Sequence, residues 1–136
     1  MTTTAVSIEE SYRANTPRSL ELFEKTRPLT AGPVKGAYFY PPYPLTMERG
    51  EGCYLYDVDG RRYVDCANHH TGQILGHNHP AVMEAVQEQM QRGIALGAPT
   101  GIETDIAAEM CRRVDSLDRI RFVNSGTEAT LHAIRL

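Results

Sequence analysis

The stretch from Ile120 to Leu136 constrains what this chain can fold into more than any other. Ile120 to Val123 is a short apolar run with the composition of a strand, and Asn-Ser-Gly at 124–126 interrupts it with residues typical of turns. From Thr127 onward, apolar residues recur at helical spacing. The sequence therefore predicts a strand that runs through a tight turn into a helix.

The predicted turn has the features of an anion site. The first N–H groups of a helix have no partner within the helix and point along its axis. Gly126 has no Cβ, so an anion can approach the backbone closely, and the hydroxyls of Ser125 and Thr127 can donate to phosphate oxygens. The same residues also suit an ordinary helix cap, in which a hydroxyl satisfies the unpaired N–H groups. On these residues alone both interpretations stay open.

Composition and charge argue against several classes of partner. The chain has 136 residues, 41% of them hydrophobic, and its net charge of −3 comes without a basic patch. Nucleic acid and membrane are therefore not expected partners. No apolar stretch is long enough to span a membrane, and the N-terminus lacks the basic and apolar regions of a secretory signal. The three cysteines are widely spaced and fit no disulfide framework, which favours a cytoplasmic location.

The rest of the chain predicts a mixed α/β protein. Prolines make residues 28–46 an extended loop, and its tyrosines imply that it packs on a core, a partner or a ligand. Alternating apolar residues around Asp59-Gly60 predict a β-hairpin over 53–66. Helices are expected over 18–25, 81–92 and 103–114, and a strand over 118–123.

Two consequences follow for domain organisation. A strand between helices indicates an α/β layer on a parallel sheet, whereas the hairpin belongs to a separate, smaller element. We expect an N-terminal segment with a loop and hairpin over 1–75 and the start of a larger α/β domain over 76–136. The chain stops at Leu136, barely two turns into an amphipathic helix and without a glycine cap. We therefore expect a fragment of a longer protein or a truncated gene model.

Four of the five histidines lie between residues 69 and 79, so a metal site must be considered. However, no acidic or cysteine ligand stands nearby at a standard spacing, and adjacent side chains on extended backbone point in opposite directions. We expect no metal site. His77-Asn78-His79-Pro80 is instead typical of a turn that leads into a helix, because proline suits the first helical position.

Four collinear motifs resemble the class-III aminotransferases, which use pyridoxal 5′-phosphate (PLP) on a fold-type-I scaffold. The similarity runs from about Pro28 to Leu136. It is carried by Tyr-Leu-Tyr-Asp-Val-Asp-Gly-Arg-Arg-Tyr-Val-Asp at 54–65, Leu-Gly-His-Asn-His-Pro-Ala-Val at 75–82, Gly-Ala-Pro-Thr at 97–100 and Phe-Val-Asn-Ser-Gly-Thr-Glu-Ala-Thr at 122–130. The resemblance implies that this is the N-terminal third of such an enzyme.

The resemblance also implies roles for particular residues. Ser125, Gly126 and Thr127 match the turn that holds the cofactor phosphate in the family. Lys35 matches a basic residue of the entrance loop that pairs with the substrate carboxylate, where relatives tend to carry arginine. His70 matches an aromatic position that lies against bound substrate or cofactor. Family members are dimers, so a homodimer is expected, with the loop at 96–100 as a candidate interface.

Within the family, the motifs at 97–100 and 124–136 look closest to glutamate-1-semialdehyde 2,1-aminomutases, whereas residues 39–45 look more like β-amino-acid transaminases. The aminomutases carry tryptophan where this chain has His70, which favours a transaminase acting on an amino acid and a keto or semialdehyde compound.

No catalytic residue is assigned, because Lys25 and Lys35 both precede the hairpin and neither stands at a strand end. We therefore expect the isolated chain to be inactive. A non-catalytic α/β phosphate-binding fragment is the alternative from another class.

Overall fold

The structure is a computed structural model that describes residues 6–31 and 41–136. The chain divides into two compact units, residues 1–88 and 89–136, and each is described by itself. The expected division into a segment at 1–75 and a larger domain at 76–136 stays a prediction.

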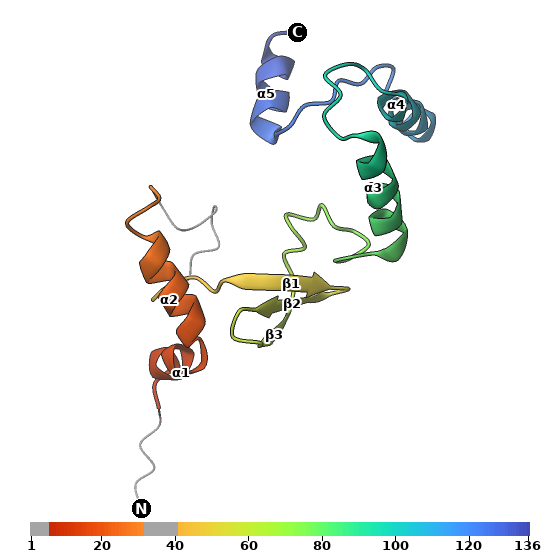
Figure 1. Cartoon of the computed structure of the whole chain (residues 1–136). Coiled ribbons are helices and arrows are strands. Elements are labelled where there is room, and N and C mark those ends of the chain that lie inside the picture. The colour runs from red at the N-terminus through yellow and green to blue at the C-terminus, as the bar shows by residue number, and fades with distance from the viewer. Residues whose placement is uncertain (1–5, 32–40) are drawn as a thin grey trace, which may run out of the picture. The chain divides into compact units, whose positions relative to one another are not determined.

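The first unit combines helices with a small sheet, and the second contains helices alone among the described residues (Figure 1). A three-stranded antiparallel sheet has the order β1-β2-β3. The elements are α1 (Ile8–Asn15), α2 (Pro17–Thr26), β1 (Met47–Glu51), β2 (Tyr54–Asp57), β3 (Arg62–Val64), α3 (Pro80–Arg92), α4 (Gly101–Arg113) and α5 (Gly126–Ile134).

The predicted hairpin at 53–66 is confirmed as β2 and β3, joined through Asp59-Gly60. Gly60 has a φ of 81°, a left-handed conformation that glycine adopts without strain. Strand β1 was not predicted. It is polar and mostly exposed, and it lies at the edge of the sheet, so its side chains show little apolar alternation.

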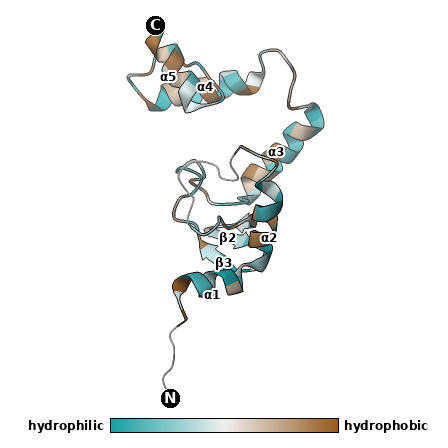
Figure 2. Cartoon of the chain, turned by 90° about the vertical axis from the view of Figure 1, so that its left-hand side faces the viewer, coloured by the Kyte–Doolittle hydropathy of each residue, from teal (hydrophilic) through white to brown (hydrophobic). Residues whose placement is uncertain are grey.

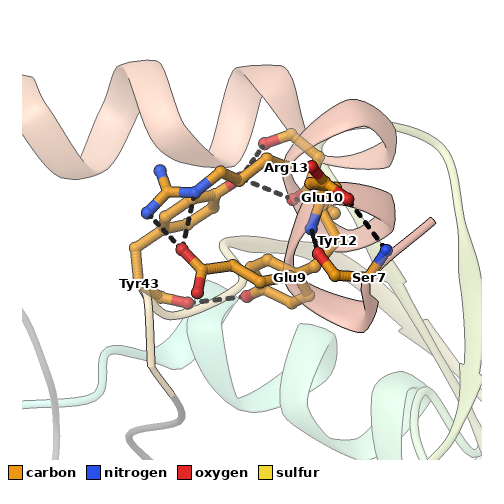
Figure 3. Close-up of polar contacts among 7 residues, drawn as sticks. Ser7, Glu9, Glu10, Tyr12, Arg13 and Tyr43 are labelled. Carbon is orange, nitrogen blue, oxygen red and sulfur yellow. Dashed lines mark hydrogen bonds and ion pairs between the residues drawn. The ribbon is translucent and has the colours of Figure 1, made fainter.

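The core of the first unit is small and largely polar. Tyr43 is its buried apolar side chain, whereas Thr16, Ser19 and Asp57 are buried polar ones. The Tyr12 hydroxyl donates to the Tyr43 carbonyl (Figure 3), with an oxygen–oxygen distance of 2.6 Å, and the two ring centroids lie 5.0 Å apart. The prediction that the proline-rich loop packs through its tyrosines is confirmed for Tyr43, whereas Tyr38 and Tyr40 lie outside the described residues.

The helix predicted at 18–25 is confirmed as α2, whereas α1 was not predicted. Helix α1 begins with a capping box in which Ser7 Oγ accepts from the Glu10 N–H and the Glu10 carboxylate accepts from the Ser7 N–H (Figure 3). The Ser-x-x-Glu pattern was the signal that could have found it. The polar composition of residues 1–16 concealed it.

The helices predicted at 81–92 and 103–114 are confirmed as α3 and α4, and Gly93, with a φ of 97°, follows the end of α3. The predicted strand at 118–123 was wrong: these residues form no strand in the structure. A strand exists only when a neighbour pairs with its N–H and C=O groups. No such neighbour is present among the described residues of the second unit.

The apolar faces of α4 and α5 are uncovered within the described part of the chain, and no residue of either helix is buried. Figure 2 shows apolar residues on α5. Among the described residues, no helix is long and apolar enough to cross a membrane.

Candidate functional site

The predicted anion site forms the N-terminus of α5. Ser125 is the N-cap residue, with extended backbone at φ −152° and ψ 157°, and its hydroxyl accepts from the Glu128 N–H at 3.2 Å. The Ser125 hydroxyl therefore caps the helix, which is one of the two roles that the sequence left open, the other being an anion site.

Glu128 lies in the first turn of α5, and its carboxylate reaches back over the cap. One carboxylate oxygen accepts from the Asn124 N–H at 2.8 Å and from the Ser125 hydroxyl at 3.2 Å. A carboxylate at this place is stabilised by the positive end of the helix dipole. It also puts a negative charge beside any anion bound at the turn.

The first two N–H groups of α5 belong to Gly126 and Thr127, and neither has a backbone acceptor among the described residues. A Cβ added to Gly126 would meet no atom within 4 Å, so the approach to these groups is open. The Thr127 hydroxyl stands beside them in sequence. The turn thus retains donors for an anion even though the Ser125 hydroxyl serves as a cap.

These residues fit a phosphate group. Two unpaired N–H groups, an adjacent hydroxyl and the positive end of a helix are the donor set that binds phosphate in proteins. The Glu128 carboxylate, which lies at the same turn, opposes binding of an anion.

A second candidate region lies within the first unit. A cavity of about 670 Å³ is lined by apolar residues that include Leu45, Met47 and Leu55 and by polar ones that include three histidines and a glutamine. Its lining residues are Tyr12, Pro44, Leu45, Met47, Leu55, Asp65, Ala67, His69, His70, Gln73 and His77. His70, predicted to face the substrate, lines this cavity. Lys35 lies outside the described residues.

The histidines of this region follow an unusual backbone. Asn68, His69, His70 and Thr71 have φ values of 47°, 48°, 55° and 68°, a run of left-handed residues without glycine. The expectation that no metal site forms here assumed extended backbone at His69-His70. The structure has left-handed backbone at these residues instead. Among the described residues, no group of three or more His, Cys, Asp or Glu side chains is placed to hold a metal ion.

Asp65 and His77 form a largely buried pair at the edge of the cavity. The Asp65 carboxylate lies 2.7 Å from His77 Nε2, and the two side chains are 8% and 15% exposed. The backbone N–H of Asn68 and then the His77 ring hold the pKa of Asp65 below its ordinary value, against the opposing effect of burial. Asp65 is therefore ionised throughout the physiological pH range.

Sequence reasoning missed Asp65 and Gln73 as residues of this region. Asp65 accepts from the Ala67 N–H two residues along the chain, and the preference of aspartate for such turns was the signal available in the sequence. Gln73 Oε1 is buried without a hydrogen-bond partner among the described residues, and nothing in the sequence indicated it.

Comparison with known proteins agrees with these features. The sequence model of the family described as aminotransferase class-III matches residues 37–136. The chain is 44% identical over 120 residues to a glutamate-1-semialdehyde 2,1-aminomutase from Methanocaldococcus jannaschii, covering 88% of this chain and 28% of that protein. The chain thus spans under a third of the length of this relative.

Solved structures give the same result. The β-phenylalanine aminotransferase from Variovorax paradoxus matches with a TM-score of 0.86 and 38% identity, over 92% of this chain and 29% of that one. A transaminase solved with PLP bound matches with a TM-score of 0.84 and 32% identity, over 88% of this chain and 28% of that one. The predicted fold class, the N-terminal part of an α/β fold-type-I transferase, is confirmed. The chain belongs to the class-III aminotransferase family.

Proposed function

We propose that this chain supplies the phosphate end of a PLP site in an enzyme that transfers an amino group between an amino acid and a carbonyl compound. The observation that carries the proposal is the turn before α5, where the Gly126 and Thr127 N–H groups have no backbone acceptor among the described residues. The chain belongs to a family in which a similar transaminase structure contains PLP, so we propose that the anion held by the turn is the PLP phosphate.

Residues 125–127 would bind the phosphate through backbone and side-chain donors. The N–H groups of Gly126 and Thr127 donate to phosphate oxygens, and the Thr127 hydroxyl adds a further donor. The Ser125 hydroxyl now donates to Glu128, and it contributes to phosphate binding by rotating away from that carboxylate. The bound cofactor would supply the electron sink for chemistry at the amino-bearing carbon. The chain's own residues bind and orient its phosphate.

His70 and the cavity that it lines form the substrate side of the proposal. Lys35, on the entrance loop, would pair with the substrate carboxylate. Lysine is a point charge and lacks the planar fork with which arginine binds carboxylate in two places, so this pairing is less specific. The substrate in this proposal is a small molecule, an amino acid or a keto or semialdehyde compound.

A transaminase is preferred to an aminomutase because of His70. Imidazole is smaller and more polar than the tryptophan expected of aminomutases at this position, and the similarity to the β-phenylalanine aminotransferase structure supports the same choice. The aminomutase alternative is supported by the 44% identity to the Methanocaldococcus jannaschii relative. We further propose a cytoplasmic homodimer, on the cysteine usage and on the family.

The phosphate site is tested by titrating the chain with PLP and, separately, with inorganic phosphate while following backbone amide resonances. The Gly126 and Thr127 amides should shift with both ligands. Gly126→Ala should abolish the shifts, because its methyl group meets nothing in the protein yet occupies the path of the anion. Gly101→Ala is the matched control, since Gly101 is also the first residue of a helix with open space at Cβ. Equal binding by both variants would refute the site.

A further inference from the structure

The backbone from Asn68 to Thr71 is strained. A left-handed conformation costs a residue with a side chain on the order of 1 kcal/mol, and four such residues follow one another here. Strain of this kind persists only where the surrounding structure enforces it, and it concentrates at functional sites. The contacts that enforce it therefore identify residues on which the local geometry depends.

Asp65 holds the entry to this left-handed turn. One of its carboxylate oxygens accepts from the Ala67 N–H at 3.0 Å and from the Asn68 N–H at 2.9 Å. The other oxygen lies 2.7 Å from His77 Nε2. Hydrogen bonds to a carboxylate are among the stronger ones in proteins, and those from Asn68 and His77 are partly buried. A single side chain thus ties the start of the turn to the histidine that follows it.

His77 is itself fixed against the sheet. Its backbone exchanges two hydrogen bonds with Gly52, of 2.8 Å and 3.0 Å. Its ring lies over Gly50 in β1, where an added Cβ would stand 2.5 Å from His77 Cγ. Glycine at position 50 therefore provides the space for this ring. The chain of contacts runs from β1 through His77 and Asp65 to the strained turn.

The turn places His69 and His70 on the wall of the 670 Å³ cavity. Leu45, Met47 and Leu55 contribute apolar lining to this cavity, which suits a hydrocarbon group, and an imidazole ring offers a flat face to an aromatic one. Gln73 lines the same cavity, and its Oε1 is a buried acceptor that lacks a donor among the described residues. An unpaired acceptor of this kind calls for a ligand donor or a water.

We propose that Asp65 and His77 are positioning residues, which hold the left-handed turn so that His69 and His70 wall a cavity for the aryl group of the substrate. The substrate class is then an amino acid whose side chain bears an aromatic ring. This inference rests on the proposed function for its substrate, but the holding of the turn by the pair stands on the contacts alone.

The first test measures amide hydrogen exchange in the full chain. The informative amides are those of Thr71, Gly72 and Gln73, which donate to carbonyls at 67–69. His77→Ala should speed their exchange about tenfold while the β1–β2 amides keep their rates, because the turn opens locally. His77→Gln should restore most of the protection, since its amide nitrogen can donate to Asp65 from a similar position.

Gly50→Ala provides an independent way to displace the His77 ring without removing a hydrogen-bonding group, and Gly101→Ala is its control. It should loosen the same three amides. Unchanged exchange in both His77→Ala and Gly50→Ala would overturn the proposal. Exchange that rises equally across the sheet would overturn it as well, because the pair would then support the unit as a whole.

The second test uses 3-phenylpropionate as the aryl probe and follows the ring resonances of His69 and His70. The unmodified chain should show saturable shifts, and His77→Ala should bind at least about tenfold more weakly, with His77→Gln between the two. Equal binding by all three would overturn the proposal. If the unmodified chain fails to bind the probe, the aryl assignment falls while the exchange result still decides the role of the pair. The PLP titration at Gly126 and Thr127 is independent of both outcomes.

Discussion

At the scale of single residues, the carboxylates of the β2–β3 hairpin have structural roles. Asp57 is fully buried and accepts from the N–H groups of Asp59 and Arg61 and from the Tyr63 hydroxyl. Burial and the hydrogen bond to Asp57 raise the pKa of Tyr63 to about 12, so the phenol stays protonated and remains a donor. The hairpin turn is thereby fixed from within.

Asp59 caps a helix that is distant in sequence. Its carboxylate accepts from the N–H groups of Arg18 and Ser19 at the start of α2, where Thr16, the N-cap residue, makes no side-chain cap. Asp59→Ala should lower the free energy of unfolding by about 1 kcal/mol, the usual value of a lost cap. Urea unfolding measures it. Asp118→Ala, at an exposed position, is the control and should change stability by much less.

Asp59 and Asp65 both contribute to the pH dependence of stability. At Asp59 burial alone would raise the pKa, but the N–H groups of Arg18 and Ser19 and the Ser19 hydroxyl lower it overall. The pKa of Asp65 is lowered as well. Because the folded pKa values lie below the unfolded value of about 3.9, the stabilisation is complete above that pH and is lost as pH falls through the folded values.

Unfolding followed by circular dichroism between pH 6 and about pH 2 tests this dependence. The loss of stability on acidification should be smaller in Asp59→Ala than in the unmodified chain. An identical loss in both would exclude Asp59 as a contributor.

Glu128 places opposing demands on the turn before α5. Its carboxylate accepts from the Asn124 N–H and favours the helix, but it repels an anion at the same end. Glu128→Gln should therefore increase the affinity for inorganic phosphate and lower helix stability by about 0.5 kcal/mol. Amide titration and thermal unfolding measure the two effects. Glu103→Gln, in the first turn of α4, is the matched control and should leave phosphate affinity unchanged.

At the scale of elements, α1 depends on local contacts. The helix contains the Ser7–Glu10 capping box and an ion pair between Glu9 and Arg13, with a nitrogen–oxygen distance of 2.9 Å (Figure 3). The exposed pair contributes little, whereas the cap satisfies otherwise unpaired N–H groups. The cap therefore accounts for most of the local stabilisation.

Ser7→Ala should fray α1 and destabilise it by about 1 kcal/mol. Amide exchange at residues 9–11 measures the local effect, and Ser116→Ala, outside the helices, is the control. Unchanged exchange at 9–11 would show that the Tyr12–Tyr43 contact holds the helix without its cap.

At the scale of the whole chain, the proposal predicts cofactor binding without turnover. Lys25 is exposed on α2, and Lys35 precedes the hairpin in the sequence and lies outside the described residues, so we expect neither to form the Schiff base. The chain mixed with PLP, an amino donor and a keto acid should produce no amino acid above the rate of PLP alone. Turnover that disappears in a Lys25→Arg, Lys35→Arg double variant would contradict this expectation.

The sequence alone determined the features that depend on neighbouring residues. The hairpin at Asp59-Gly60, the helix start at Pro80, the N-cap at Ser125 and the end of α3 at Gly93 follow from backbone preferences and capping, which act over a few residues. The Ser-Gly-Thr turn is another local feature. The sequence could therefore predict that the N–H groups of Gly126 and Thr127 lack backbone acceptors.

The tertiary structure decided the features that join distant residues. It brought Asp59 to α2, docked His77 on Gly50 and set the left-handed turn at 68–71 through Asp65. It also left 118–123 without strand pairing, because pairing requires a neighbour that no local pattern supplies. Contacts of this kind depend on where the chain returns in space, and short-range preferences carry no information about that.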